Sequence, residues 1–377
     1  MQFVRRATAP RIALDCRLLG WPGVGRYCVE LARALVTAAP DLRFFWLCSA
    51  AGRDRLPIAP NASPLVIGAR PFSIGEQIVV PGVLRRHAID LLHAPTSTTL
   101  PMLAPRLVVT VHDLLLRRFP EFLPNSLGRT YYRLMTRAAV SRAQCIITVS
   151  EFTRRDVVEF WPAVEYKTRV ILNGVASRFR PVRDEASLRD ISSRLQLPAN
   201  YLLYVGTRKR HKNLPRLLEA YGRLSTEQRT RCPFVLVAPP DARYPEVDDV
   251  VRREDISANL HWLSQIADED MPVLYSKARV VVLMSLYEGF GFPVVEAQAC
   301  GTPALIASAA ALPEIAGDAA ISVDPYDVES IHRALARMIE DDVLRDTLAR
   351  KALANVARFS WENTAEQVAD VYRKALP

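Results

Sequence analysis

The sequence lacks several patterns that would assign it to a common class of protein. Its six cysteines form no C-x-x-C pair and lie mostly inside apolar runs, so we predict buried thiols rather than a zinc site or a disulfide framework. No stretch approaches 18 apolar residues, and no segment is therefore predicted to span a membrane. The N-terminus shows no apolar core of a signal peptide, and we predict a cytoplasmic location.

The chain also lacks the spacing of a dinucleotide-binding loop. In the segment GWPGVG, only Gly23 and Gly25 precede Arg26, and no further glycine completes a G-x-G-x-x-G motif. A nicotinamide-dependent dehydrogenase, one alternative function, is disfavoured for that reason. The other alternative is a non-catalytic sugar-binding protein of two domains. Such proteins are usually secreted, and the lack of a signal peptide therefore disfavours this alternative. The glycines of this loop either form a tight turn or approach a phosphate through backbone amides.

Acidic residues are scarce in the first half of the chain. Residues 1–180 hold 25 Lys/Arg against 12 Asp/Glu, whereas residues 181–377 hold 24 against 28. A basic half predicts attraction to anionic headgroups at the inner face of a membrane or to a pyrophosphate-linked acceptor. A merely solubilising surface accounts for the same charge. The basic residues are dispersed, without an aromatic-interleaved pattern, so nucleic acid is not predicted as a partner.

Apolar strand-like runs alternate with helix-like segments along the whole chain. This βαβ pattern predicts an α/β protein with mostly parallel, doubly wound sheets. The pattern pauses at the polar segment 177–183, so we predict two Rossmann-like domains, residues 1–180 and 181–359. The predicted strands are RIALDCRLL, LRFFWLC, LVIGA, DLLHAP, RLVVTVHD and CIITVS in the first domain, and YLLYVG, FVLVAPP, NLHWLS, RVVVLMS, TPALIA and AAISVDP in the second.

Residues 280–307 are the most informative segment. The apolar run Val280–Leu286 predicts a buried parallel strand, followed by a loop and a short helix that Gly301 ends. Glu288 lies in the loop, and Glu296 is predicted to lie in an exposed first turn of the helix. A helix N-terminus behind a parallel strand attracts anions. Because carboxylates also accept hydrogen bonds from the diols of ribose and of sugars, we predict a nucleotide-sugar site.

The segment EGFGFPVVE resembles the E-x7-E signature of retaining family 4 glycosyltransferases of GT-B fold. Other segments resemble the family in the expected order: GVGRY, VHDLLLRRFPEF, VSEFTRRDV, ILNGV, YVGTRKRHKNLPRLLEAY and FSWENTAEQVADVY. The resemblance implies two Rossmann-like domains facing each other across a cleft, with residues 360–377 packing back on the N-terminal domain.

The resemblance also implies the reaction. A hexose of mannose or rhamnose type passes from a nucleotide diphosphate sugar to a glycan or polyprenyl-linked acceptor in polysaccharide or O-antigen synthesis. A GDP-sugar is the favoured donor, with UDP or dTDP possible, and neither a cofactor nor a metal is implied. Asp268 and Asp270 form a D-x-D sequence, which binds manganese in metal-dependent glycosyltransferases. Here it precedes a helix-like segment, and we interpret it as a helix cap.

A second electropositive loop, Gly206–Lys212, follows an apolar strand. Four of the five positions from 208 to 212 are cationic at the start of a predicted helix, which is unfavourable with the helix dipole, so we predict that an anion compensates them. The resemblance implies that Lys212 neutralises the donor pyrophosphate. His211 stands where the family commonly has arginine, and Arg208 or Arg210 are candidates for the missing charge.

His112 ends a predicted strand of the first domain, where it is either a satisfied structural histidine or a site residue. By resemblance it contacts the donor sugar or organises the reacting centre. The predicted catalytic residues are therefore His112, Lys212 and Glu288. The predicted donor-binding residues are Gly23, Gly25, Thr207, Arg208, Arg210, Gly289, Phe290, Gly291, Phe292 and Glu296.

Overall fold

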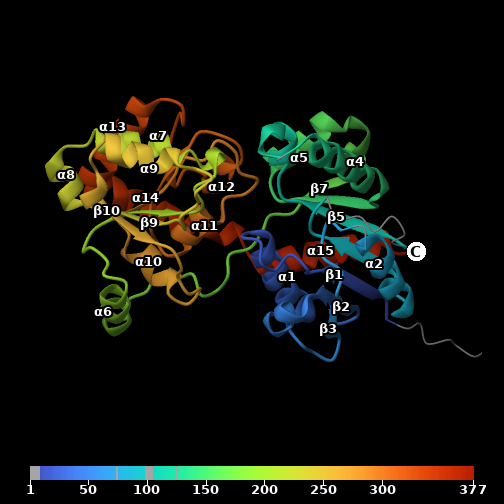
Figure 1. Cartoon of the computed structure of the whole chain (residues 1–377). Helices are drawn as coiled ribbons and strands as arrows, with labels where there is room; N and C mark the ends of the chain where they lie inside the picture. The colour runs from blue at the N-terminus through green and yellow to red at the C-terminus, as the bar shows by residue number, and fades with distance from the viewer. Residues whose placement is uncertain (1–8, 74, 98–104, 124) are drawn as a thin grey trace, which may run out of the picture. The chain divides into compact units, whose positions relative to one another are not determined.

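The computed structural model describes residues 9–73, 75–97, 105–123 and 125–377, and the chain divides into two compact units. Unit 1 comprises residues 1–174 together with 360–377, and unit 2 comprises residues 175–359 (Figure 1). The sequence pattern placed the boundary at residue 180, whereas the chain passes into unit 2 at Val175. Each unit contains its own parallel sheet, which confirms the predicted α/β class with two Rossmann-like domains.

Unit 1 is built on a seven-stranded sheet with the order β3-β2-β1-β4-β5-β6-β7, in which all neighbouring strands pair in parallel. The strands are β1 Arg11–Asp15, β2 Arg43–Cys48, β3 Ala62–Val66, β4 Leu91–Ala94, β5 Leu107–Val111, β6 Cys145–Thr148 and β7 Thr168–Val170. The helices are α1 Val24–Ala38, α2 Glu76–Arg86, α3 Leu115–Arg118, α4 Ser126–Arg142, α5 Glu151–Phe160 and α15 Trp361–Ala375, with 3₁₀ turns at Ala50–Arg55, Pro120–Phe122 and Pro162–Lys167.

The C-terminal helix α15 belongs to unit 1, where it packs beside α1 (Figure 1). Its hydroxyl groups bind the unit at both ends: Thr364 Oγ1 donates to the Leu172 carbonyl at 2.7 Å, and Tyr372 Oη lies 2.6 Å from His93 Nδ1. A Cβ atom on Gly174 would lie 2.3 Å from the Trp361 nitrogen. The helix is therefore an integral part of the first unit, although 185 residues of unit 2 precede it in the chain.

Unit 2 is built on a six-stranded parallel sheet with the order β10-β9-β8-β11-β12-β13. The strands are β8 Leu202–Val205, β9 Phe234–Val237, β10 Leu260–Leu263, β11 Val280–Leu283, β12 Ala304–Ala307 and β13 Ala320–Val323. The helices are α6 Glu185–Arg194, α7 Leu214–Gly222, α8 Thr226–Arg231, α9 Glu246–Arg253, α10 Met271–Lys277, α11 Phe292–Ala299, α12 Leu312–Ala316, α13 Val328–Glu340 and α14 Asp342–Asn355, with 3₁₀ turns at Arg210–Lys212, Ser257–Asn259 and Val356–Arg358.

Most apolar runs of the sequence became strands, and the central strands are buried, whereas β10 and β13 are only partly buried. Every residue of β5 and of β11 is buried, as expected for central parallel strands covered on both faces. The strands are shorter than the runs, because the chain leaves the sheet at Asp15 and again after Leu283. The sequence pattern missed β7, a three-residue strand at the edge of the sheet, which is too short to show a period.

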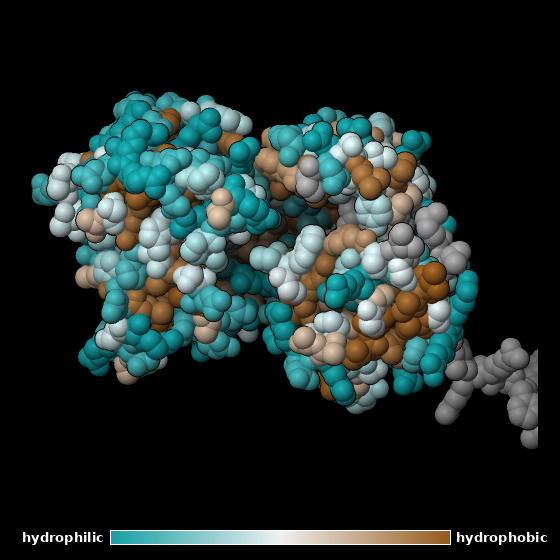
Figure 2. Space-filling view, viewed as in Figure 1, coloured by the Kyte–Doolittle hydropathy of each residue, from teal (hydrophilic) through white to brown (hydrophobic). Residues whose placement is uncertain are grey.

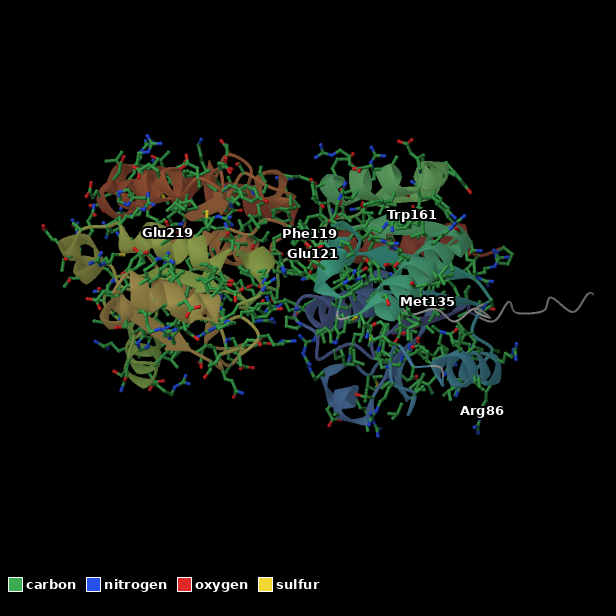
Figure 3. All side chains as sticks on the ribbon, turned by 45° about the horizontal axis from the view of Figure 1, so that its top comes forward. Arg86, Phe119, Glu121, Met135, Trp161 and Glu219 are labelled. Carbon is green, nitrogen blue, oxygen red and sulfur yellow. The ribbon has the colours of Figure 1, made fainter. Side chains whose placement is uncertain are left out.

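The burial of the cysteines matches the prediction made from the sequence, and the polar character of much of the surface matches the composition. All six cysteines lie in the described part of the chain, and they are buried and free, as predicted. Within the described ranges, no helix combines the length and apolar character that crossing a bilayer requires. The viewed face of unit 2 over α13 and α7 is mostly hydrophilic, whereas unit 1 shows apolar patches among polar ones (Figure 2). Arg86, one of the many exposed arginines of unit 1, extends from the end of α2 (Figure 3).

Candidate functional site

The strand order of unit 2 reverses between β8 and β11. From β8 the chain proceeds outward through β9 and β10, and from β11 it proceeds outward on the other side through β12 and β13. In an open parallel sheet, ligands bind outside the carboxyl ends of the strands at such a reversal, because the two loops there diverge. The loop after β8 holds Gly206–Lys212, and the loop after β11 holds Glu288. The topology thus brings together the two segments that carry the strongest sequence signals.

Backbone hydrogen bonds fix the loop between β11 and α11. The Leu286 N–H donates to the His211 carbonyl at 2.7 Å, which ties this loop to the β8 loop, and the Ala311 N–H donates to the Glu288 carbonyl at 3.2 Å. Gly291, the residue before α11, has φ +99°, a conformation that favours glycine. Its Cβ would also lie 2.7 Å from Leu312 Cδ2, a methyl group at the end of a side chain that can shift, so the backbone conformation is the main reason for glycine there.

The aromatic residues of this loop serve the core. Phe290 is 4% exposed, and its ring meets those of Phe292 and Phe359 edge to face at centroid distances of 5.1 and 5.7 Å. Its side chain therefore contacts other aromatic rings. A contact between Phe290 and the nucleotide-sugar donor would have to come from its backbone atoms. Gly289 and Gly291 are buried as well, and Phe292 is partly buried as the first residue of α11.

Lys212 and Glu288, two predicted catalytic residues, form an ion pair. Lys212 Nζ lies 2.5 Å from Glu288 Oε1, and Ser285 Oγ donates to the same oxygen at 2.7 Å. Both charged side chains are shielded, with 17% and 16% exposed. Burial raises the pKa of Glu288, but the Lys212 charge and the hydrogen bonds from Lys212 and Ser285 outweigh it and hold that pKa below its ordinary value. Glu288 is therefore an ionised carboxylate at neutral pH.

Carboxylates of α9 compensate two other cations of the β8 loop. Arg208 Nη1 donates to Asp248 Oδ1 at 2.8 Å, and Arg210 Nε donates to Glu246 Oε1 at 3.2 Å. Side chains of α9 therefore balance two of the four cations, and the expectation that an anionic ligand compensates the charge of this loop stays a prediction. The acidic run Glu246–Asp249 was the signal that sequence reasoning missed.

The two arginines differ in their environment. The Arg208 side chain is 7% exposed and lies over the Trp262 ring, with 4.2 Å from the guanidinium carbon to the ring centroid. The Arg210 side chain is 67% exposed. Among the described residues, Arg208 Nε and Thr207 Oγ1 are buried without a hydrogen-bond partner. These polar atoms support the prediction that the β8 loop faces a ligand.

His211 lies between the exposed Arg210 and Lys212 in the 3₁₀ turn and is buried. Burial and the charge of Lys212 lower the pKa of His211 to about 4, against an opposing effect of Glu288. The imidazole is thus neutral at pH 7. Where the family commonly has a cationic arginine, this chain has an uncharged ring, and Lys212 is the shielded cation of the turn.

Glu296 lies deeper than the sequence indicated. The prediction of an exposed position in the first helical turn was wrong: α11 begins at Phe292, so Glu296 is its fifth residue, and it is 1% exposed. Its Oε2 accepts a hydrogen bond from Tyr275 Oη at 2.8 Å. Tyr275 comes from α10, a contact that the spacing of the two glutamates does not reveal. The end of α11 matches its prediction, since Gly301 follows the helix with φ +77°.

Asp270 of the D-x-D sequence forms a bidentate ion pair. Its two oxygens accept from Arg194 Nη2 and Nη1 of α6 at 2.7 and 2.9 Å. The prediction of a helix cap was wrong in its detail, because Asp270 directly precedes α10 but its side chain accepts no capping hydrogen bond. The carboxylate is instead held by an arginine, which occupies the oxygens that a metal ion would use.

In unit 1, His112 directly follows β5. Its ring meets the Tyr27 ring edge to face at 4.7 Å, and burial lowers its pKa to about 4. Its Nε2 is buried without a hydrogen-bond partner among the described residues. By contrast, His93 on β4 is fully buried and bonded at both ring nitrogens, to Tyr372 Oη and Thr110 Oγ1. His93 is therefore a satisfied core histidine, whereas His112 keeps a polar atom for a further contact.

The loop after β1 has structural reasons for its glycines. Gly23 precedes α1 with φ +79°, and Gly25 is the second residue of that helix. A Cβ atom on Gly25 would lie 2.2 Å from the Leu19 carbonyl oxygen. The tight-turn interpretation thus suffices for both residues, and their donor-binding role stays a prediction.

We expect Gly25→Ala to lower the free energy of unfolding by about 1–3 kcal/mol, the typical cost of overpacking. Gly20→Ala is the matched control, because no atom lies within 4 Å of a Cβ there, and it should stay within about 0.5 kcal/mol. Thermal unfolding of both variants measures the difference. Full stability of Gly25→Ala combined with lost activity would instead indicate that the glycine admits a ligand.

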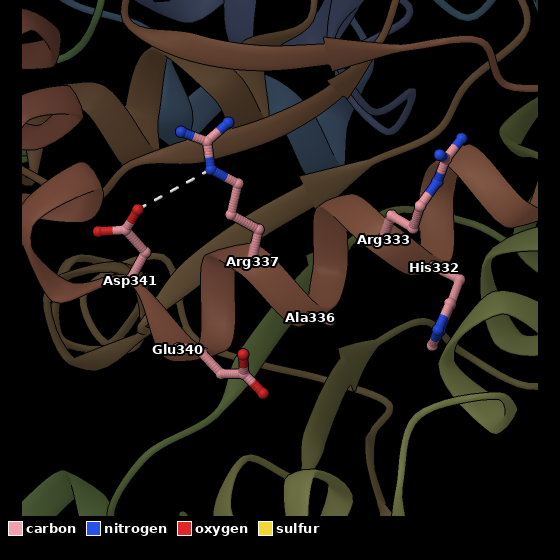
Figure 4. A pocket seen from close by; sticks show the side chains of 6 residues that line it. All are labelled: His332, Arg333, Ala336, Arg337, Glu340 and Asp341. Carbon is pink, nitrogen blue, oxygen red and sulfur yellow. Dashed lines mark ion pairs between the residues drawn. The ribbon is translucent and has the colours of Figure 1, made fainter.

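A hollow on the surface of α13 does not have the features of a ligand site. Its lining residues come from one face and the end of that helix, and its charged pair Arg337–Asp341 is 3.8 Å apart (Figure 4). The remaining lining residues are His332, Arg333, Ala336 and Glu340. Ligand sites usually gather polar groups from several elements, and this one does not.

Two parallel-sheet Rossmann-like domains define the GT-B class of glycosyltransferases, and solved structures agree. The fold of the chain matches Anabaena HepE in complex with UDP-glucose with a TM-score of 0.79 and 19% sequence identity, over 97% of this chain and 99% of that one.

Sequence comparisons give the family. Residues 21–178 match the model described as Glycosyltransferase Family 4, and residues 190–355 match Glycosyl transferases group 1. The chain is 31% identical over 373 residues to the O-antigen chain mannosyltransferase B of Escherichia coli, covering 93% of this chain and 96% of that protein. It is 28% identical to the D-inositol 3-phosphate glycosyltransferase of Streptosporangium roseum, covering 99% and 95%. The chain belongs to the family 4 glycosyltransferases, as the E-x7-E segment predicted.

Proposed function

We propose that the chain transfers mannose, or a related hexose, from a nucleotide diphosphate sugar to a hydroxyl of a growing polysaccharide or lipid-linked oligosaccharide. The observation that carries the proposal is the Lys212–Glu288 pair at the strand-order reversal of unit 2, which joins a cation for a diphosphate to a carboxylate for sugar hydroxyls. Its similarity to an O-antigen chain mannosyltransferase supports the sugar and the class of acceptor. A GDP-sugar is the proposed donor, with UDP and dTDP sugars as alternatives.

Each site residue has a proposed role. Lys212 and the amides of the β8 loop stabilise the negative charge that develops on the departing diphosphate. Glu296 accepts from the ribose diol, and Glu288 with the backbone from Gly289 to Phe292 holds the sugar. Transfer proceeds with retention at the anomeric carbon, and the departing phosphate takes the proton of the acceptor hydroxyl. The imidazole of His112 in unit 1 is neutral at pH 7, and its role in the reaction stays a prediction.

Purified protein incubated with GDP-mannose and a lipid-linked or mannose-terminated acceptor tests this function. The expected products are GDP and an α-linked mannoside, because retention preserves the α configuration of the donor, and proton NMR of the new anomeric signal reports it. UDP-glucose and dTDP-rhamnose serve as competing donors. A β-linked mannoside formed from GDP-mannose would contradict retention, and the absence of transfer from every sugar nucleotide would contradict the function.

We expect the transferase to retain its full rate in excess EDTA. Lys212 and the β8 loop meet the diphosphate charge, and the Asp270 carboxylate is bound to Arg194. Initial rates with EDTA, and with added Mn²⁺ or Mg²⁺, measure the effect. Loss of activity that Mn²⁺ alone restores would show that a metal ion takes part.

We further propose that unit 1 docks on anionic lipid. Helix α4 exposes Leu127 and Leu134 (78% and 58%) and contains no acidic residue. Within the described chain, none of its arginines forms an ion pair; they are Arg129, Arg133, Arg137 and Arg142. Vesicle sedimentation should show binding to anionic vesicles that falls steeply with salt, since exposed charges are screened beyond about 8 Å at physiological ionic strength. Leu134→Glu should weaken it, and equal binding to neutral vesicles would contradict it.

A further inference from the structure

The cation proposed for the diphosphate and the carboxylate proposed for the sugar are bonded to each other. Lys212 Nζ and Ser285 Oγ both contact Glu288 Oε1, at 2.5 and 2.7 Å. With both charged side chains less than one-fifth exposed, the pair is screened less than a surface pair. Removing one partner of a shielded pair is unfavourable for the partner that remains. Any anion that binds Lys212 therefore competes with Glu288.

Backbone hydrogen bonds oppose separation of the pair by loop movement. The His211 carbonyl accepts the Leu286 N–H at 2.7 Å, and the Glu288 carbonyl accepts the Ala311 N–H at 3.2 Å. Gly291 precedes α11 in a left-handed conformation, with φ +99°, that favours glycine. Lys212 must consequently leave Glu288 by rotation of its own flexible side chain. The carboxylate stays in place when the ammonium moves.

We propose that Glu288 is a specificity determinant that favours the intact nucleotide sugar over the free nucleoside diphosphate. A diphosphate that binds Lys212 removes the cation from Glu288. The intact donor compensates the carboxylate, because its sugar hydroxyls donate to Glu288. The free diphosphate carries no sugar, so it leaves a shielded carboxylate with the Ser285 hydroxyl as its remaining partner among the described residues.

This arrangement acts on product release. Before transfer, Lys212 binds the diphosphate and Glu288 binds the sugar. After transfer, Glu288 loses the sugar hydroxyls and again attracts Lys212, which weakens the hold on the diphosphate product. The substrate and the product carry the same diphosphate. The ion pair thus allows the substrate to bind tightly while it weakens the binding of the product.

Isothermal titration of GDP and GDP-mannose into the full chain tests the inference, which rests on the diphosphate site of the proposed function. In Glu288→Gln the amide oxygen still accepts from Ser285 and from sugar hydroxyls, but it no longer holds the Lys212 charge. GDP should bind at least about fivefold more tightly, the lower end of typical coupling between linked interactions. GDP-mannose should gain less, so the preference for the intact donor should shrink.

A second variant should move in the opposite direction. Ser285→Ala leaves Glu288 with Lys212 as its remaining partner, so GDP should bind more weakly than to the unmodified chain. Asp324→Asn is the charge control, because Asp324 is an exposed carboxylate that follows β13 at the same edge of the sheet. It should change GDP affinity less than about twofold, since exposed charges interact weakly.

The outcomes separate the inference from the proposed function. Unchanged or weaker GDP binding by Glu288→Gln would overturn the inference alone, as would equal tightening by Asp324→Asn. If Glu288→Gln does not fold, tighter GDP binding by Ser285→Ala would overturn it. A full chain that binds neither GDP nor UDP would overturn the proposed function and, with it, the inference.

Discussion

Lys212→Ala should lower kcat by about 10²–10³-fold, the scale of losing one preorganised electrostatic group. In the proposed mechanism, Lys212 stabilises charge that grows on the diphosphate as the glycosidic bond breaks, so it should contribute more in the transition state than in the ground state. KM for the donor should change less than kcat. Lys212→Arg should recover part of the rate, because the guanidinium keeps the charge but differs in shape from the ammonium. Steady-state kinetics with GDP-mannose measure all three quantities.

Because Lys212 is paired with Glu288, the Lys212→Ala experiment needs a control for the effect on that carboxylate. Lys212→Ala leaves a shielded carboxylate without its cation, which repels the diphosphate independently of catalysis. The double variant Lys212→Ala, Glu288→Gln removes that repulsion, and the loss of kcat should persist in it. An alanine variant that raises KM alone would show that Lys212 is a uniform binding contact, and Arg208 or Arg210 would take the catalytic role.

Glu296→Ala should weaken GDP binding by about 1–3 kcal/mol, the cost of losing hydrogen bonds to a charged group. The same change leaves the buried Tyr275 hydroxyl without its acceptor, so the variant should also lose stability. Glu296→Gln keeps an oxygen for Tyr275 and removes only the charge. Calorimetric titration with GDP and thermal unfolding of both variants distinguish ribose binding from packing.

Tyr275→Phe is the matched control for Glu296. It removes the hydroxyl that positions the carboxylate but leaves the carboxylate itself. If Glu296 binds the ribose, Tyr275→Phe should reduce GDP affinity less than Glu296→Ala does. Unchanged binding of GDP and GDP-mannose by Glu296→Ala would remove the ribose assignment and leave Glu296 as a core partner of Tyr275.

Features encoded by neighbouring residues were predictable. The apolar runs specified most strands, because a strand covered on both faces needs only consecutive apolar side chains. Gly301 ended α11 where the prediction placed it, since its left-handed conformation is a local property of the chain. The E-x7-E segment also sufficed to predict the family, because all its residues lie on one loop and one helix.

Features that depend on distant residues were not predictable. The sequence placed Glu296 in an exposed turn, but Tyr275 from α10 covers it. The sequence predicted that an anionic ligand compensates the cations of the β8 loop. In the structure, Asp248 and Glu246 of α9 form ion pairs with two of them. Such partners lie tens of residues away, and the spacing of a motif carries no information about which elements pack against it.

The sequence by itself determined the βαβ pattern, the two-domain organisation and the residue types of the proposed donor site. The tertiary structure alone decided how those residues pair. Lys212 and Glu288 are 76 residues apart, and they meet because β8 and β11 are neighbours at the point where the strand order reverses. That adjacency is set by the packing of whole strands in the sheet. It turns two separate sequence signals, one for a diphosphate and one for a sugar, into a single ion pair.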